Sequence, residues 1–152
     1  MTRIFDQMMT LFGHGDWELQ QVPGETIASV TYQSGDDSWV FVASTNEALR
    51  TVTLFARPRE VCPVERMGAM VDFFNRVNFG MSHGAWCLDA NDGEIRYRVG
   101  VDLAGRDLTG DELGAVTNYV NTVMGASLPA LRAIIDGSAT PIDAMSMIFG
   151  PG

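Results

Sequence analysis

The sequence predicts a single α+β domain in which helices pack on one antiparallel sheet. Segments with apolar residues at every third or fourth position, typical of helices, alternate with shorter runs in which every second residue is apolar, typical of half-buried strands. Short turn sequences join most of the strand-like runs, and short connections favour antiparallel neighbours. The length of 152 residues fits one domain of ordinary size. We therefore expect residues 1–152 to form one domain of α-βββ-α-ββ-α order, with a C-terminal helical appendage over residues 136–152.

The first half of the chain is predicted to form a helix and then three strands. The helix spans residues 1–12, and Gly13 provides its stop. Its apolar residues recur at helical spacing: Ile4, Met8, Leu11 and Phe12. Three strand-like runs follow at residues 26–32, 38–43 and 50–57. Turn residues separate these runs, so we expect an antiparallel meander.

The second half of the chain is predicted to form a helix, a hairpin and a further helix. The first of these helices covers residues 63–78. Its predicted apolar, core-facing stripe consists of Met67, Met70, Val71, Phe74 and Val77. The hairpin pairs residues 85–89 with residues 94–103, in which apolar and polar residues alternate. The next helix begins at the capping box Thr109–Glu112. Pro129 is expected to bend or break this helix, because proline lacks the backbone N–H that a helix interior uses.

The charge balance argues against two classes of partner. The chain has 19 acidic and 10 basic residues, a net charge of −9, and all of the basic residues are arginines. Proteins that bind nucleic acids depend on clusters of basic residues that neutralise phosphates, and anionic membranes attract the same clusters. No apolar run approaches the roughly 18 residues of a membrane span. We therefore expect neither a nucleic acid nor a membrane as a direct partner.

Cysteines and histidines form no recognisable metal or redox motif. Cys62 and Cys87 stand far apart without a C-x-x-C pair, and His14 and His83 are scattered. We expect no metal, no cofactor and a reducing cytoplasmic setting, in which both cysteines serve as small apolar residues. Whether the two cysteines ever pair stays open from the sequence alone.

Two short motifs resemble catalytic or metal-binding sequences. Residues 80–84 read G-x-S-x-G, but a helix is predicted before them and a strand after them, the reverse of a nucleophile elbow. Residues 89–94 resemble the start of a calcium loop, but the sixth position holds Glu94 in place of the required glycine. We expect a connecting loop and a hairpin turn at these places, and no catalytic residue.

Asn75 and Asn78 lie near the end of the predicted helix over residues 63–78. Asparagine accepts the left-handed conformation that often ends a helix. We interpret the two asparagines as C-terminal caps, with a ligand-binding role as the alternative.

Methionines and aromatic residues supply the candidate partner-binding side chains. The nine methionines include pairs near both ends of the chain, and methionine suits irregular cores as well as adaptable binding surfaces. Core packing is the alternative for most of them. The candidates for a partner-binding surface are Met8, Met9, Phe12, Trp39, Trp86, Met145 and Met147.

Several segments give most of the chain a resemblance to the YbjN family, which shares the fold of type III secretion chaperones. The segments that carry it are Phe73–Asn78, Gly84–Asp89, Asp92–Arg98, Leu108–Leu113 and the aromatic strand Trp39–Val42. The resemblance implies a bacterial α-βββ-α-ββ-α domain, often dimeric, with no known enzymatic activity. It also implies a sensory transduction regulator or a chaperone-like binder of protein segments.

We therefore expect a non-catalytic, homodimeric adaptor or chaperone-like regulator. It is expected to hold an exposed segment of another protein along an apolar groove or a sheet edge. The alternative is a small-molecule sensor or an unrecognised enzyme. The pocket of that alternative is expected near Trp39, Trp86, Tyr97, Arg96 and Arg98, with the arginines pairing an anionic ligand.

Overall fold

The structure, a computed structural model, describes residues 3–150. In chain order its elements are α1 (Ile4–His14), β1 (Gln20–Gln21), β2 (Ile27–Ser34), β3 (Asp37–Asn46), β4 (Thr51–Pro58), the short 3-10 helix η1 (Val64–Arg66), α2 (Met67–Gly80), β5 (Ala85–Leu88), β6 (Ile95–Asp102), α3 (Gly110–Asp136) and α4 (Pro141–Phe149). Residues 1–2 of the predicted N-terminal helix and residues 151–152 of the predicted appendage lie outside the described residues.

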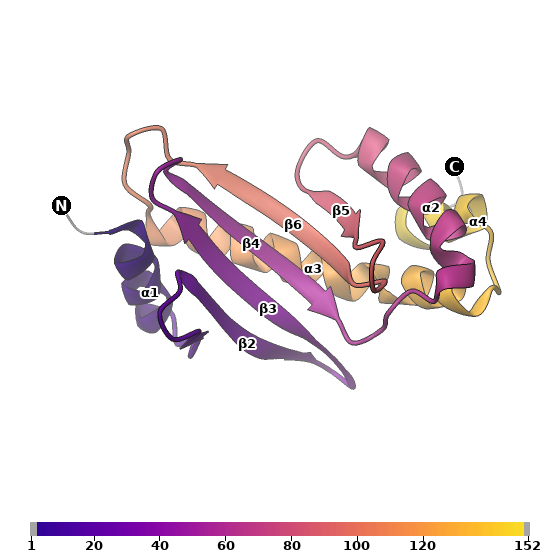
Figure 1. Ribbon diagram of the computed structural model, residues 1–152, viewed down its shortest axis with the longest axis horizontal. Helices are drawn as coiled ribbons and strands as arrows, with labels where there is room; N and C mark the ends of the chain where they lie inside the picture. Colours follow the sequence, from indigo (N-terminus) through magenta and orange to yellow (C-terminus); the bar gives the residue numbers. More distant parts are fainter. Residues whose placement is uncertain (1–2, 151–152) are drawn as a thin grey trace.

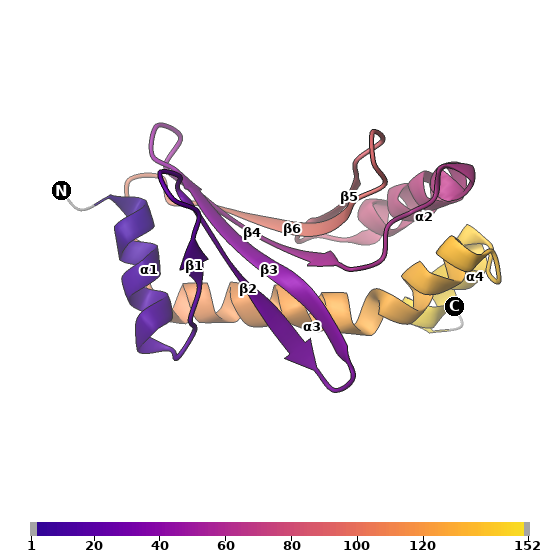
Figure 2. The ribbon, with the colours of Figure 1, turned by 60° about the horizontal axis from the view of Figure 1, so that its bottom comes forward.

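The strands form one six-stranded antiparallel sheet in the order β1-β2-β3-β4-β6-β5. α3 lies along one face of this sheet, and in the described chain no helix covers the opposite face (Figure 1). α1 lies at one end of α3, whereas α2 and α4 lie at the other end (Figure 2). The predicted α+β architecture is confirmed, and the element that the sequence pattern missed is β1, a strand of two residues.

Alternating strand residues build the core between the sheet and α3. The inward residues of the neighbouring strands β4 and β6 are buried, namely Val52, Leu54, Ala56, Ile95, Tyr97 and Val99. They face one another across the ladder, with Leu54 opposite Val99 and Ala56 opposite Tyr97. α3 contributes its own row of buried residues, namely Val120, Met124, Leu128 and Leu131. Burying one such large side chain contributes about 1.5–3 kcal/mol, so this layer holds the sheet on α3.

α3 begins at the predicted capping box, but only half of the box forms. Thr109 Oγ1 accepts a hydrogen bond from the Glu112 N–H at 3.2 Å. In a complete capping box the Glu112 carboxylate would accept a hydrogen bond from the Thr109 N–H. Here it accepts two hydrogen bonds from Arg106 instead, at 2.6 and 2.7 Å. A guanidinium presents two parallel donors that match a carboxylate. This ion pair holds the pKa of Glu112 below its ordinary value.

Pro129 was predicted to bend or break its helix, and the structure shows no break. The 27-residue helix α3 continues through Pro129 and ends where Gly137 adopts a φ of 79°. A proline inside a helix costs about 3 kcal/mol, because one hydrogen bond is lost and the ring crowds the preceding turn. The burial of Leu128, Ala130 and Leu131 on both sides of the proline offsets this cost. The axis of α3 changes direction in this C-terminal part (Figure 2).

Candidate functional site

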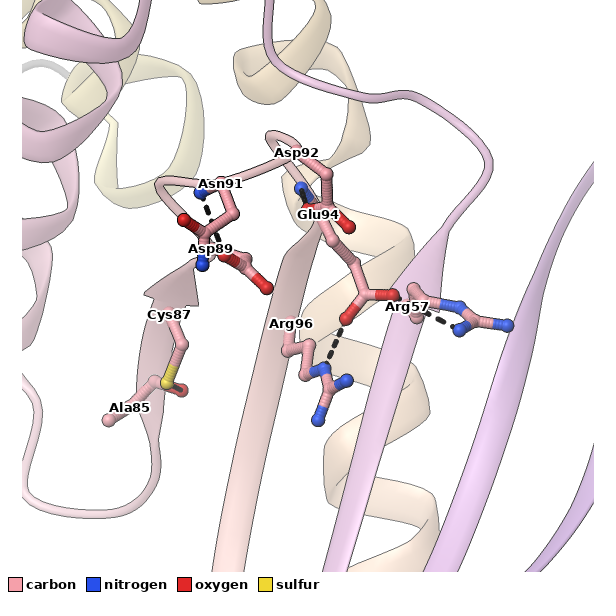
Figure 3. A network of polar contacts seen from close by, with 8 residues as sticks. All are labelled: Arg57, Ala85, Cys87, Asp89, Asn91, Asp92, Glu94 and Arg96. Atoms are coloured by element: carbon pink, nitrogen blue, oxygen red, sulfur yellow. Dashed lines mark hydrogen bonds and ion pairs between the residues drawn. The ribbon is translucent and has the colours of Figure 1, made fainter.

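The open face of the sheet carries an arginine–glutamate network beside the β5–β6 turn. Glu94 accepts hydrogen bonds from Arg57 of β4, at 3.1 Å, and from Arg96 of β6, at 2.5 Å (Figure 3). The Arg96 guanidinium carbon also lies 4.4 Å from the centroid of the Phe55 ring, a cation–π contact. One carboxylate therefore pairs with two guanidiniums, and the Asp89 carboxylate lines the same hollow as Arg96 and Arg98.

The turn that carries Glu94 is the hairpin predicted in place of a calcium loop. The Asp89 carboxylate accepts a hydrogen bond from the Asn91 N–H at 2.8 Å, and the Asp92 carboxylate accepts one from the Glu94 N–H at 2.9 Å (Figure 3). Asx turns of this kind use aspartate oxygens to satisfy backbone donors. The hairpin interpretation is confirmed, and the turn fixes Glu94 at the start of β6.

The side chain of Arg98, two residues further along β6, has neither an ion pair nor a hydrogen bond within the described residues. All ten arginines lie in the described range, and only Arg59 and Arg98 lack such a partner. Arg98 borders a groove of about 480 Å³ together with Thr53 and Gly100. A guanidinium that is free in a groove offers two donors to a carboxylate.

The groove follows a free edge of the sheet. β5 pairs only with Ile95–Arg98, whereas β4 pairs with the other edge of β6 as far as Asp102. Backbone groups of successive residues in an antiparallel strand point to alternate sides. Because the Leu103 N–H donates to the Arg50 carbonyl on the β4 side, Gly100 and Asp102 direct their backbone N–H and C=O groups to the other edge. The Asp102 carbonyl accepts a hydrogen bond from the Arg106 side chain at 3.4 Å, so the groups left for another strand are those of Gly100 and the Asp102 N–H.

The neighbouring edge, along β5, is closed by a side chain. The Asn78 amide of α2 donates to the Trp86 carbonyl at 3.0 Å and accepts from the Trp86 N–H at 2.8 Å. The side chain therefore takes the place of a neighbouring strand. The prediction that Asn78 caps its helix is wrong, because α2 continues to Gly80. Asn75 is exposed on α2.

The G-x-S-x-G segment forms the loop from α2 to β5, as predicted. The His83 carbonyl accepts hydrogen bonds from the Tyr97 hydroxyl at 2.8 Å and from the Tyr119 hydroxyl at 3.4 Å. Burial, together with the adjacent Tyr119, raises the pKa of Tyr97, so its hydroxyl stays a protonated donor. Gly84 has a φ of +77°, and a Cβ there would overlap with the Tyr97 hydroxyl. The glycine lets the loop pass close to the Tyr97 side chain.

Most of the candidate partner-binding residues lie in the core. Four of them are at most 3% exposed, namely Met8, Phe12, Trp39 and Trp86. Met9 and Met145 are partly buried against the same core. Met147 is 49% exposed, so its side chain is accessible. Because α1 and the strands turn their apolar residues toward α3, the four buried side chains hold the fold together. For Met147, partner binding stays a prediction.

The five residues of the alternative pocket lie on opposite faces of the sheet. Trp39, Trp86 and Tyr97 point into the core and are at most 3% exposed. Arg96 and Arg98 point to the open face, where both are exposed. Since successive residues of a strand point to opposite sides, Tyr97 cannot line one pocket with the two arginines that flank it.

Trp39 is tied into the core by a hydrogen bond that can be tested. Its indole N–H donates to Asn121 Oδ1 of α3 at 2.7 Å, and both residues are buried. We expect Asn121→Leu to lower the free energy of unfolding by about 1–3 kcal/mol, because the buried indole N–H loses its acceptor. Urea unfolding followed by tryptophan fluorescence measures this change.

Thr117, one turn before Asn121 on α3, provides the control. Its hydroxyl is also buried but has no hydrogen-bond partner in the described residues. We expect Thr117→Val to leave stability unchanged or to raise it, because the substitution removes an unsatisfied polar group. Equal destabilisation by both variants would show that the Trp39–Asn121 bond is not the cause.

Exposed apolar side chains gather at the end of the molecule formed by α2 and α4. Of the nine large apolar residues that are exposed within residues 3–150, seven lie here: Val61, Val64, Val71, Phe79, Ile142, Met147 and Phe149. The Phe79 side chain is 95% exposed. α2 and α4 pack on each other at this end (Figure 1). Such a concentration is typical of surfaces that bind other proteins.

On η1 and α2 the exposed residues form a stripe, the α2 stripe, on the side away from the core. It consists of Val64, Gly68, Val71, Asn75 and Phe79, spaced three or four residues apart. The core-facing side consists of Met70, Phe73, Phe74 and Val77. The sequence pattern placed Val71 on the apolar core face, but the structure leaves 55% of it exposed. Val71 lies beyond the edge of the buried side.

The sequence matches the model of a known protein family over most of its length. A family model described as "YbjN: Putative bacterial sensory transduction regulator" matches residues 5–133. The chain belongs to the YbjN family. The matched range holds the whole YbjN sheet, with the free edge of β6 and the α2 stripe, and ends within α3. No curated protein matches the sequence.

A solved structure shows the same fold as this YbjN family member. The Yersinia pestis type III secretion chaperone SycH, solved in complex with a stable fragment of YscM2, matches with a TM-score of 0.51. The sequence identity is 14%, and the match covers 78% of this chain and 95% of the chaperone chain. At this identity the likeness shows a shared fold, which confirms the chaperone-like architecture.

Residues 3–150 of the YbjN chain contain neither a metal-binding cluster nor a membrane-spanning helix. No group of three or more potential metal ligands comes together there. None of the helices in this range combines the length and the apolar character needed to cross a bilayer.

Proposed function

We propose that this chain is a non-catalytic, cytoplasmic protein-binding adaptor that works as a homodimer and holds an extended segment of a protein partner. The observation that carries the proposal is the free edge of β6 at Gly100 and Asp102, beside Arg98. An extended peptide that adds to such an edge gains main-chain hydrogen bonds, and side chains next to the edge select its sequence. A reproducible enzymatic turnover by the purified protein would contradict the non-catalytic part.

The charge next to the edge selects the chemistry of the partner segment. The Arg98 side chain is unpaired within the described residues, because Glu94 binds Arg57 and Arg96 instead. A segment with an Asp or Glu side chain on this face therefore matches Arg98, although the chain as a whole carries a charge of −9. The SycH complex with a YscM2 fragment gives a precedent in this fold for binding part of another protein.

Gly100→Pro tests strand addition directly. Proline removes the N–H that Gly100 directs to the free edge, but it leaves the hydrogen bonds between β4 and β6 in place. We expect the variant to capture at least about tenfold less partner, since at least one main-chain hydrogen bond is lost and the ring obstructs the edge. Tagged protein in lysate of the source organism, with capture quantified by mass spectrometry against a tag-only control, gives this measurement.

Two matched variants make the outcome specific. Gln33→Pro removes an N–H from the free part of the β2 edge, and Arg59→Glu reverses the charge of the other unpaired arginine. We expect both variants to capture the partner as the wild type does, whereas Arg98→Glu loses it. Retention of the same partner by Gly100→Pro and Arg98→Glu would contradict binding at β6.

The α2 stripe supports the homodimer. An antiparallel two-fold pairing of two copies places Val64 of one copy against Phe79 of the other, and Gly68 against Asn75, with the two Val71 side chains near the axis. An interface between identical surfaces must be complementary to itself in this way. The small Gly68 lets the helices approach closely.

The charge pattern of α2 fits pairing with a second copy. Two chains of charge −9 repel each other unless the contact itself is neutral. The α2 stripe contains no charged residue, and the adjacent Asp72 and Arg76 form an ion pair within the helix at 2.8 Å. Glu65, exposed beside the same stripe, has no ion pair within residues 3–150, so each copy brings one unpaired charge next to an otherwise neutral contact.

A further inference from the structure

The free edge of β6 is closed at one end, where β5 begins. β5 runs antiparallel to β6, and its first residue, Ala85, lies opposite Arg98 (Figure 1). Just before Ala85 the chain leaves the line of β5. Gly84, with a φ of +77°, lies close to Tyr97 and Val99, whose side chains face the core. The later part of β6 is therefore left without a neighbouring strand, and the entry of β5 forms the closed end of its groove.

The backbone pattern of β6 determines how a segment can pair with this edge. The Asp89 N–H donates to the Glu94 carbonyl at 2.9 Å across the β5–β6 turn. Every second residue after Glu94 therefore directs its N–H and C=O groups to the β5 side. Gly100 is one of these residues, and it lies beyond the end of β5. A partner residue opposite Gly100 would form two main-chain hydrogen bonds, one with the N–H and one with the C=O.

The two ends of the groove carry opposite charges. Arg98 lies at the closed end and Asp102 at the open end, and both line the groove of about 480 Å³. The other carboxylates that border Arg98 form hydrogen bonds within the β5–β6 turn or with Arg57 and Arg96. A carboxylate on a bound segment is therefore attracted to the closed end and repelled from the open end.

We propose that the partner segment is the C-terminus of another protein, bound antiparallel to β6 with its terminal carboxylate at Arg98. This inference rests on the proposed strand addition at β6 and names the kind of segment that is added. A segment in this direction continues the line of β5, so beyond Gly100 it must end or turn away before it reaches Ala85. A chain that ends opposite Gly100 directs one carboxylate oxygen to the Gly100 N–H and leaves the other for the Arg98 guanidinium.

Other segments fit the groove less well. A segment parallel to β6 that starts at the closed end would place its N-terminal ammonium group beside Arg98, a contact between like charges. An internal Asp or Glu also supplies a carboxylate, but its chain must then bend away from the edge to avoid Ala85. The last residue of a C-terminal segment has space for its side chain on the open face, because a Cβ on Gly100 would meet nothing within 4 Å.

Random heptapeptides fused to the C-terminus of a carrier protein are suitable probes. Full-length wild-type protein is used to select binders. Each selected heptapeptide is then synthesised with a free carboxylate, with a C-terminal amide and with two added glycines. We expect the amide and the extended form to bind at least about tenfold more weakly than the free acid, because each loses the carboxylate at Arg98. Fluorescence anisotropy measures the three affinities.

Arg98→Gln identifies the group that recognises the carboxylate. We expect this variant to bind the free acid about tenfold more weakly than the wild type does and the amide equally well, so the preference for the free acid disappears. Arg59→Gln, at the other unpaired arginine, is the control and is expected to keep the preference. Circular dichroism confirms that both variants are folded.

Gly100→Pro distinguishes failure of this inference from failure of strand addition. Equal binding of the three peptide forms, together with loss of binding in Gly100→Pro, would overturn the terminal carboxylate but leave strand addition at β6 standing. Selected peptides that bind Gly100→Pro as tightly as the wild type, or a selection that yields no binder, would overturn both.

Discussion

Gly93→Ala is expected to lower the free energy of unfolding by about 3 kcal/mol or more. Gly93 has a φ of +82°, and a Cβ at this position would overlap with the Cys62 carbonyl oxygen. Neither group can shift freely, because the Gly93 N–H donates to the Asp89 carbonyl at 2.7 Å and the Cys62 N–H donates to the Gly93 carbonyl at 2.9 Å. Relief of the overlap requires the loss of at least one of these bonds. Urea unfolding gives the value.

Gly35→Ala separates the two causes of the stability loss in Gly93→Ala, namely the positive φ and the overlap with the Cys62 carbonyl. Gly35 also has a positive φ, +60°, but a Cβ there meets nothing within 4 Å. We expect this variant to lose only about 1–2 kcal/mol, the cost of the left-handed conformation. If both variants lose the same amount, contact with Cys62 contributes nothing and the turn is free to move.

The Gly93 turn also determines the position of the charges on the open face. It supports Glu94, which binds Arg57 and Arg96. A partly folded Gly93→Ala protein is therefore expected to disturb this network before it disturbs α1, which lies at the opposite end of the molecule (Figure 1). Amide hydrogen exchange distinguishes such local opening from global unfolding.

Helices and strands with a strongly periodic pattern of apolar residues could be predicted from the sequence. Ile95, Tyr97 and Val99 alternate with polar residues, and they face the core as predicted. The break expected at Pro129 does not occur, because local propensity says nothing about the packing on both sides of a proline. The buried residues around Pro129 come from contacts across the fold, which outweigh the local cost.

The candidate site was harder to predict, because it depends on pairing between distant segments. The free edge at Gly100 exists because β5 is shorter than β6, and the β5 edge is closed because Asn78 reaches Trp86. Neither fact leaves a pattern in the sequence. Trp39 was taken for a surface residue because aromatic side chains suit both cores and interfaces, and only the position of α3 decides between them.

The α2 stripe did leave a signal in the sequence. Val64, Val71 and Phe79 recur at helical spacing on the side opposite Phe74 and Val77. A helix with apolar residues on two sides packs on two partners, and here one partner is the sheet. The second apolar side was assigned to the core because the periodicity alone does not show where the first side ends.

Phe79→Asp is expected to convert a dimer of this chain into a monomer. The side chain is 95% exposed, and the proposed two-fold interface would contain it twice, each time against Val64 of the other copy. Loss of two apolar contacts and burial of two carboxylates are expected to raise the dimer dissociation constant at least about 100-fold. Light scattering coupled to size-exclusion chromatography measures the mass over a range of concentrations.

Leu49→Asp is the matched control for this experiment. Leu49 is 69% exposed in the turn between β3 and β4, away from α2, so the same charge is added to the surface outside the α2 stripe. We expect it to remain dimeric, and we expect Phe79→Leu to retain most of the association because an apolar side chain is kept. A wild-type protein that stays monomeric at high concentration, or a Leu49→Asp variant that dissociates equally, would contradict pairing through α2. In that case Phe79 would be expected to contact the partner protein instead of a second copy. The capture experiment described for Gly100→Pro would then be repeated with Phe79→Asp.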